Sequence, residues 1–162
     1  MISSTTDAFK RVMRRFPTGV TVVTSVRDGE PRGMTLSSFA SVAAAPPTVL
    51  VCVNREARSY LYIAHSLVFC VNLLALEQRA LAERFSGLVR ERQFDGIAYR
   101  TGVTGAPVLD GTIAYLECRV MEEHPIETHS LFVGRVVACD ARGGRPLGYF
   151  DGAYHDFGVA TE

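Results

Sequence analysis

The sequence GMTLSSF, residues 33–39, leads through Pro46-Pro47 into the apolar run TVLVCV, residues 48–53. The first segment is typical of the end of a β-strand, where alternate side chains share a face, so Thr35 and Ser37 are expected to point in the same direction. Together with Ser38 they can hydrogen-bond the mixed donor and acceptor edge of a planar polar ligand. The same hydroxyls can instead close a turn by bonding to nearby backbone, so both interpretations stay open for this segment.

Further strands are predicted on both sides of this segment. Residues 20–26 and 31–38 flank Asp28-Gly29, which is a strong signal for a tight hairpin between antiparallel strands. The continuous apolar character of residues 48–53 and 67–74 predicts strands that are buried on both faces. Later strand-like runs cover residues 112–122, 130–139 and 146–150.

Helices are expected at three separate places. Residues 7–16 have apolar side chains at helical spacing, with Thr5 or Thr6 as a possible cap, and residues 58–65 and 76–85 have shorter helical patterns. Residues 86–101 are polar and are expected to form a surface loop able to act as a lid. Because single helices do not alternate with strands, we predict a mainly β protein, a small β-barrel with peripheral helices, formed by one domain over residues 1–162.

Composition limits the classes of partner. Lys and Arg total 17, which equals the 17 Asp and Glu residues, so no long-range field favours nucleic acid or an anionic membrane. No apolar stretch approaches the roughly 20 residues that span a bilayer, and the polar start differs from a signal peptide, so a cytoplasmic protein is expected. The four cysteines lie in apolar runs without a CxxC pair and are expected to be core residues rather than metal ligands.

Several common catalytic motifs are absent from the sequence. It contains no GxGxxG, no GxxxxGK[ST] and no GxSxG, so a Rossmann site, a P-loop and a nucleophile elbow have no support. His124 and His129 stand among glutamates, but alternating strand geometry would scatter these side chains, so no metal site is expected.

The order of several short motifs is more specific than any one of them. The set comprises PTGVTVVT (17–24), GMTLSSFASV (33–42), PPTVLVCVN (46–54), FCVNLL (69–74), TGVTGAPVLDG (101–111), THSLFVGRV (128–136) and PLGYFDGAYH (146–155). This ordered set resembles the short flavin reductases that serve two-component monooxygenases, such as the reductase component of 4-hydroxyphenylacetate 3-monooxygenase.

The resemblance implies an FMN-binding split β-barrel, usually a homodimer. Such an enzyme oxidises NADH or NADPH, passes the hydride to FMN or FAD, and supplies reduced flavin to a flavin-dependent monooxygenase. The alternative is a split-barrel flavoprotein that holds flavin as a prosthetic or carried ligand without oxidising NAD(P)H.

The resemblance also implies roles for individual residues. The flavin ring and its phosphate end would be lined by Thr35, Leu36, Ser37 and Ser38. The phosphate would be held by Asn54, Arg55, Arg58 and Ser59. Phe85 and Gly87 would pack against the flavin. His129, as the catalytic residue, and Tyr154 would lie on the nicotinamide side of the ring. Asn72 lies in a predicted buried strand, where its amide must bond either to the backbone or to the cofactor.

Overall fold

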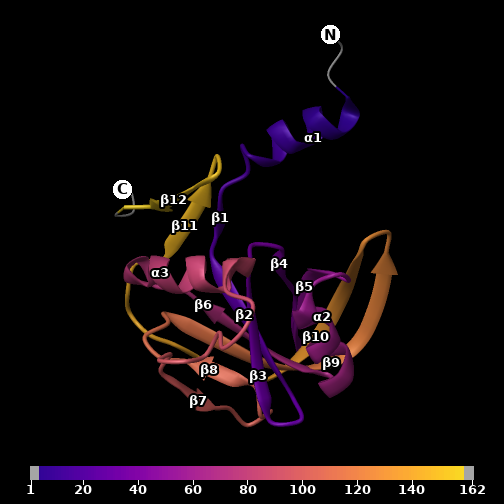
Figure 1. Cartoon of the computed structure of the whole chain (residues 1–162), viewed down its shortest axis with the longest axis vertical. Helices are drawn as coiled ribbons and strands as arrows, with labels where there is room; N and C mark the ends of the chain where they lie inside the picture. Colours follow the sequence, from indigo (N-terminus) through magenta and orange to yellow (C-terminus); the bar gives the residue numbers. More distant parts are fainter. Residues whose placement is uncertain (1–3, 159–162) are drawn as a thin grey trace.

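The computed structural model describes residues 4–158, and its largest sheet is antiparallel with the strand order β3-β2-β6-β9-β10-β5-β4 (Figure 1). Its strands are β2 (Thr21–Arg27), β3 (Glu30–Leu36), β4 (Phe39–Ala44), β5 (Pro47–Asn54), β6 (Val68–Leu73), β9 (Ala114–Ile126) and β10 (His129–Ala141). A small sheet contains β1 (Thr18–Gly19), β11 (Leu147–Phe150) and β12 (Ala153–Asp156), and another pairs β7 (Tyr99–Thr101) with β8 (Pro107–Leu109).

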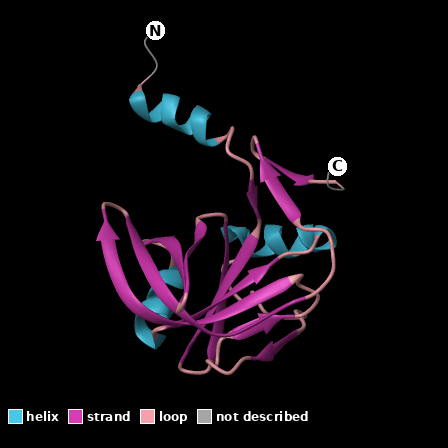
Figure 2. Cartoon of the chain, turned by 180° about the vertical axis from the view of Figure 1, so that it is seen from behind, coloured by secondary structure: helices cyan, strands magenta, loops and turns pink. Residues whose placement is uncertain are grey.

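The helices lie at the periphery of the sheet, as Figure 2 shows. They are α1 (Thr5–Met13), α2 (Arg58–Ser66) and α3 (Arg79–Glu83), with the 3₁₀ turn η1 (Leu76–Gln78) before α3 and the π turn η2 (Arg84–Leu88) after it. The mainly β architecture with peripheral helices is therefore confirmed. Within residues 4–158, no helix is long and apolar enough to cross a membrane.

Strand β2 is buried on both of its faces because successive side chains alternate across the sheet. Val22 packs in a cluster with Phe85, whereas Val23 packs in a second cluster with Phe69 and Phe132. The sheet thus separates two apolar layers. The layer that contains Phe85 supports β3.

The predicted hairpin and the predicted buried strands are largely confirmed. Asp28 and Gly29 have φ angles of 51° and 81°, which is the left-handed backbone that a tight two-residue turn requires. Strand β6 is buried along nearly its whole length, whereas β5 is buried on one face and half-buried on the other. Strands β9 and β10 extend further than predicted and meet at the turn Glu127-Thr128.

Five strands of residues 4–158 were not predicted, namely β1, β4, β7, β8 and β12, and β7 lies within the segment 86–101 that was expected to be a loop. Strand β4 is an exposed edge strand rich in alanine, which is a weak strand former, so its sequence gives little signal. Strand β12 forms because the turn at Asp151-Gly152 folds the chain back on β11.

Helix α1 differs from its predicted bounds at both ends. It begins two residues earlier because the Ser4 hydroxyl, rather than Thr5 or Thr6, accepts from the Asp7 N–H at 3.2 Å. It ends at Met13, before Pro17, since the residue preceding a proline disfavours helical backbone. Both figures show α1 standing apart from the sheet, and none of its described residues is buried.

The cysteines are only partly the core residues expected from the sequence. Cys70 and Cys118 are buried, and Cys52 is half-buried. The prediction is wrong for Cys139, which is exposed because the far end of β10 runs beyond the apolar layers.

Candidate functional site

A cavity of about 380 Å³ lies between β3, the start of α2 and the η2 turn. Its wall on β3 runs from Arg32 to Thr35, and the opposite wall is formed by the loop and helix start from Glu56 to Ser59. Residues 85–87, Arg90 and Gln93 complete the lining. The cavity is thus built from three segments that are far apart in the sequence.

A second cavity, of about 210 Å³, continues from the first along the end of β3. Thr35 and Ser86 line both cavities, so the two adjoin and share part of their wall, and together they are called the groove. The far end of the second cavity is aromatic, because Tyr149 and Tyr154 stack edge to face with ring centroids 5.6 Å apart. The two cavities therefore differ in chemical character, and together they suit a ligand with dissimilar ends.

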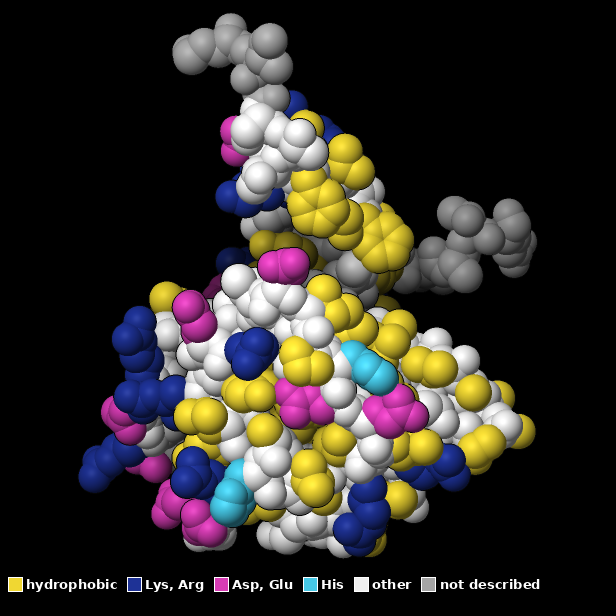
Figure 3. Space-filling model, turned by 90° about the vertical axis from the view of Figure 1, so that its right-hand side faces the viewer, with side chains coloured by type: hydrophobic (Ala, Val, Ile, Leu, Met, Phe, Trp, Pro, Cys, Tyr) yellow, Lys and Arg dark blue, Asp and Glu magenta, His cyan; other side chains and the backbone are white. Residues whose placement is uncertain are grey.

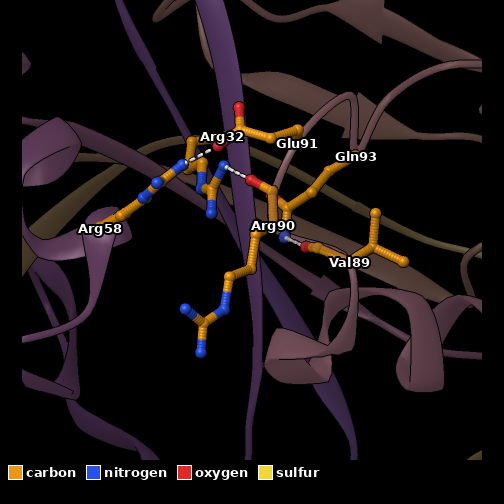
Figure 4. Close-up of polar contacts among 6 residues, drawn as sticks. All are labelled: Arg32, Arg58, Val89, Arg90, Glu91 and Gln93. Atoms are coloured by element: carbon orange, nitrogen blue, oxygen red, sulfur yellow. Dashed lines mark hydrogen bonds and ion pairs between the residues drawn. The ribbon is translucent and has the colours of Figure 1, made fainter.

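Positive charge is concentrated at the other end of the groove. The first cavity is lined by Arg32, Arg58 and Arg90 but by only one acidic residue, Glu56. Arg58 forms a hydrogen-bonded ion pair with Glu91, and the Arg32 Nη1 atom donates to the Arg90 carbonyl at 2.6 Å (Figure 4). Guanidinium groups grouped in this way fit the oxygens of a phosphate.

Arg32 provides an independent sign of an anion site. Its Nε atom is buried without a hydrogen-bond partner. Burial, followed by the nearby positive charge of Arg58, lowers the pKa of the Arg32 guanidinium. A buried donor without an acceptor is costly, and an anion in the cavity would relieve both effects.

Helix α2 presents its first residues to this end of the groove. The residue before the helix, Ala57, provides no side-chain cap, so no capping oxygen competes for the first N–H groups. The Ser59 hydroxyl donates to the Gly33 carbonyl at 3.3 Å and ties the helix start to β3. Ser59 therefore fixes the position of its neighbour Arg58.

Phe85 and Gly87 shape the cavity wall. Phe85 is buried and packs edge to face on Phe94, with ring centroids 5.1 Å apart. Gly87 has a φ of +99°, which L side chains rarely adopt, so glycine allows the chain to turn out of the helix here.

The hydroxyl row of residues 35–38 is divided by the fold. Thr35 and Ser37 line the same second cavity together with Leu36, as the predicted alternation requires for the first two. The Thr35 hydroxyl donates to the Ala82 carbonyl at 2.7 Å and keeps its acceptor capacity for a ligand. Ser38 lies outside both cavities, and its hydroxyl donates to the Cys52 carbonyl at 2.8 Å, so it ties the end of the hydroxyl row to β5.

Asn72 requires a correction, because it does not face the groove. It is fully buried, its Nδ2 atom donates to the Val22 carbonyl at 3.1 Å, and its Oδ1 atom accepts from the Leu109 N–H at 2.8 Å. The structure thus decides between the two roles left open by the sequence. Asn72 joins β2, β6 and β8, and its assignment to the cofactor is wrong.

His129 and Tyr154 are not brought together within one chain. His129 pairs with Asn54 across β10 and β5, and its Nδ1 atom lies 2.9 Å from the Thr128 hydroxyl. Figures 1 and 2 both place the β9–β10 turn and β12 on opposite sides of the molecule. His129 is therefore adjacent to the loop that begins at exposed Arg55, whereas Tyr154 lines the second cavity.

Several residues that line the groove were not predicted from the sequence. These are Arg32, Ser86, Arg90, Gln93 and Tyr149. Gln93 is buried, its Oε1 atom accepts from the Gly33 N–H at 3.4 Å and its Nε2 atom donates to the Val89 carbonyl at 3.0 Å. For those of them that lie within residues 86–101, the only signal was the polar composition of that segment, from which a lid was expected.

Comparison with known proteins agrees with this geometry. Residues 13–158 match the family model described as the flavin reductase like domain. The chain belongs to the flavin reductase family. It is 36% identical over 154 residues to the FMN reductase (NADH) RutF of Cronobacter sakazakii, covering 92% of this chain and 91% of that protein.

Two further members of the flavin reductase family are similar to this chain. One is a subunit of a monooxygenase system, and the structure of the other contains bound ligand fragments. The reductase subunit HsaB of a flavin-dependent monooxygenase from Rhodococcus jostii is 37% identical over 147 residues, covering 90% of this chain and 75% of that protein. The NADH:FAD oxidoreductase SgcE6 of Streptomyces globisporus, solved with NAD and FAD fragments, superposes with a TM-score of 0.92 at 32% identity, over 100% and 99% of the two chains. The split β-barrel expected for the family is thereby shown.

Proposed function

We propose that the chain is an NAD(P)H-dependent flavin reductase that reduces FMN or FAD and supplies reduced flavin to a flavin-dependent monooxygenase. The observation that carries the proposal is the pair of adjoining cavities, with arginines lining one and hydroxyls and tyrosines lining the other. A flavin has the same two-ended chemistry, since an anionic phosphate chain is attached to a planar ring. The names of the relatives point to the same reaction.

The residues of the groove fit a flavin. The Arg32 Nε atom lacks a hydrogen-bond partner, and arginines outnumber acidic residues in the lining of the first cavity. Both features suit an anionic phosphate. Thr35 and Ser37 supply hydroxyls that can donate or accept at the ring edge, and Leu36 adds an apolar contact. We accordingly assign the phosphate end to Arg58, Ser59 and the backbone beside them.

The protein's contribution to the reaction is orientation. When bound, the flavin ring supplies the acceptor for the hydride of the reduced nicotinamide. Phe85 and Gly87 set the depth of the groove, and Tyr154 bounds it at the ring end. Holding two reactants at near-attack distance contributes about 7–11 kcal/mol, so this chemistry needs no nucleophile. His129, beside the loop of Asn54 and Arg55, lies on the opposite side of the molecule from Tyr154, so it is proposed to position the nicotinamide at the flavin of a second copy of the chain.

The assembly proposed is a homodimer. Phe9, Val12 and Phe16 on and after α1 have exposed fractions of 62%, 66% and 64%. A nine-residue helix standing apart from the sheet has little intrinsic stability, so an apolar face of this kind requires a partner surface. Figure 3 shows the hydrophobic side chains gathered along the projecting helix, where a second copy would cover them. A cytoplasmic location, where NADH is available, is part of the same proposal.

The proposed activity is tested by a steady-state matrix of NADH and NADPH against FMN, FAD and riboflavin. Oxidation of at least one nucleotide, dependent on added flavin, is the expected result. Dialysis separates the flavin substrate from a prosthetic flavin, since a reductase of diffusible flavin loses its colour and regains activity when flavin is added. No oxidation with any of the six pairs would refute the assignment.

A further inference from the structure

We propose that Glu91 is a specificity-determining residue whose carboxylate occupies, at Arg58, the position of a flavin phosphate, so that it competes with phosphorylated flavins for the site. The inference rests on the proposed function and concerns the same groove. It adds a residue outside the cavity lining that sets how strongly the phosphate is held.

The geometry places protein oxygens where phosphate oxygens would bind. Two consecutive residues of the loop 89–98 supply them: the Arg90 carbonyl accepts from Arg32, and the Glu91 carboxylate accepts from Arg58. Figure 4 shows both arginines directed to this short stretch of loop, while the Arg90 side chain extends away from the Arg58–Glu91 pair. A phosphate offers the same acceptor oxygens to the same two guanidinium groups.

The pair is held in a way that allows exchange. Arg58 and Glu91 are both largely exposed, with 55% and 75% of their side chains accessible, and exposed ion pairs are weak. The loop beside them is fixed by buried Gln93, which bonds to Gly33 and to Val89. Glu91 can therefore leave Arg58 by a side-chain movement alone.

Both groups are charged when the pair exchanges. The hydrogen bond and the charge of Arg58 lower the pKa of the Glu91 carboxyl, and the hydrogen bond with Glu91 raises the pKa of Arg58. At neutral pH the carboxylate is thus a true anionic competitor. It returns to Arg58 when a phosphate departs, which favours release of the flavin over its retention.

Glu91→Gln tests this inference, because it keeps the size of the side chain and removes its charge. Dissociation constants for FMN and riboflavin are measured by flavin fluorescence or calorimetry at low salt. We expect the Kd of FMN to fall about two- to fivefold, because this is the range that the free energy of an exposed ion pair corresponds to. The Kd of riboflavin should stay unchanged, because riboflavin has no phosphate. The gain should shrink in about 0.5 M salt because the competing charges are screened.

Two comparisons isolate the pair. Glu77→Gln removes the same charge from η1, outside both cavities, and should leave both dissociation constants unchanged. In an Arg58→Gln background, Glu91→Gln should give a smaller gain for FMN, since the arginine for which the two anions compete is absent.

Three results would overturn the inference. They are an FMN affinity unchanged or weakened by Glu91→Gln, an equal tightening of FMN and riboflavin, and an equal effect of Glu77→Gln. Failure of the proposed function is distinguishable, because it would appear as wild-type protein that binds flavin without oxidising NADH or NADPH.

Discussion

The ring of Phe85 packs on the bare backbone of Gly33, where a Cβ atom would come within 2.8 Å of the Cδ1 and Cε1 atoms of the ring. This contact joins the π turn to β3 and forms the wall of the arginine-lined cavity. The wall depends on a glycine for steric reasons, although Gly33 has no positive φ.

Gly33→Ala should therefore displace Phe85. We expect a loss of about 1–3 kcal/mol in the free energy of unfolding, as for other overpacked sites, together with a higher KM for flavin. Thermal and urea denaturation measure the first effect. Gly19→Ala is the matched control, since a Cβ atom there meets nothing within 4 Å, and its stability should change by less than about 0.5 kcal/mol. Equal stabilities of the two variants would contradict the packing argument.

Asn72→Leu tests the structural role of the buried amide. The variant leaves the Val22 carbonyl and the Leu109 N–H without their partner, so a loss of about 2–4 kcal/mol is expected in chemical denaturation. Because Asn72 does not face the groove, the KM for flavin of the folded variant should stay within about twofold. A stable Asn72→Leu protein with a tenfold higher KM would restore a role in cofactor binding.

His129→Ala tests the proposed contact with the nicotinamide. Loss of one hydrogen bond predicts a rise of about three- to tenfold in the KM for the nucleotide, with the KM for flavin little changed. His124→Ala is the control, because His124 is exposed on β9 and pairs with Glu122. If both variants resemble the wild type, His129 has no part in nucleotide binding.

Phe9→Asp tests the proposed dimer. A charge on the apolar face of α1 should shift the protein toward the monomer on dilution, as measured by light scattering after size-exclusion chromatography. Leu61→Asp introduces the same charge at an exposed apolar side chain of α2 and should leave the assembly intact. A monomeric wild type, or dissociation by Leu61→Asp alone, would place the interface elsewhere or remove it.

The thiols should react with a disulfide reagent in a defined order. Cys139 is exposed and should react first at pH 8, followed by half-buried Cys52. Burial raises the pKa of the Cys118 thiol to about 12 and also raises that of Cys70, so at pH 8 almost no thiolate forms at either. These two should react only after unfolding, and Cys139→Ser should abolish the fast phase.

The sequence predicted those parts of the fold that depend on neighbouring residues. Asp28-Gly29 dictates its hairpin locally through left-handed backbone, and the apolar pattern of residues 68–73 identifies a buried strand. Strand β4 could not be found in this way, since its exposed alanines form a strand only because β5 offers a free edge. The length of β9 and β10 likewise depends on their pairing with each other.

The site was predictable where its residues are adjacent in the chain. Arg58 and Ser59 stand together at a helix start, a few residues after the motif of residues 46–54. Arg32 and Arg90 become neighbours only when β3 passes under the loop 89–98, and nothing local distinguishes them from solvated charges. The choice of partner for Asn72 depended on the position of Leu109, 37 residues away.

Thr35 and Ser86 line both cavities of the groove, so the surfaces presented to the two ends of a ligand share these two side chains. A ligand that moves either side chain from one chamber alters the surface presented to the other. Linkage requires any such effect to be reciprocal. If a bound phosphate changes the affinity at the tyrosine end by some factor, occupancy of the tyrosine end changes the affinity for phosphate by the same factor. A substitution of Thr35 or Ser86 therefore alters the lining of both ends at once.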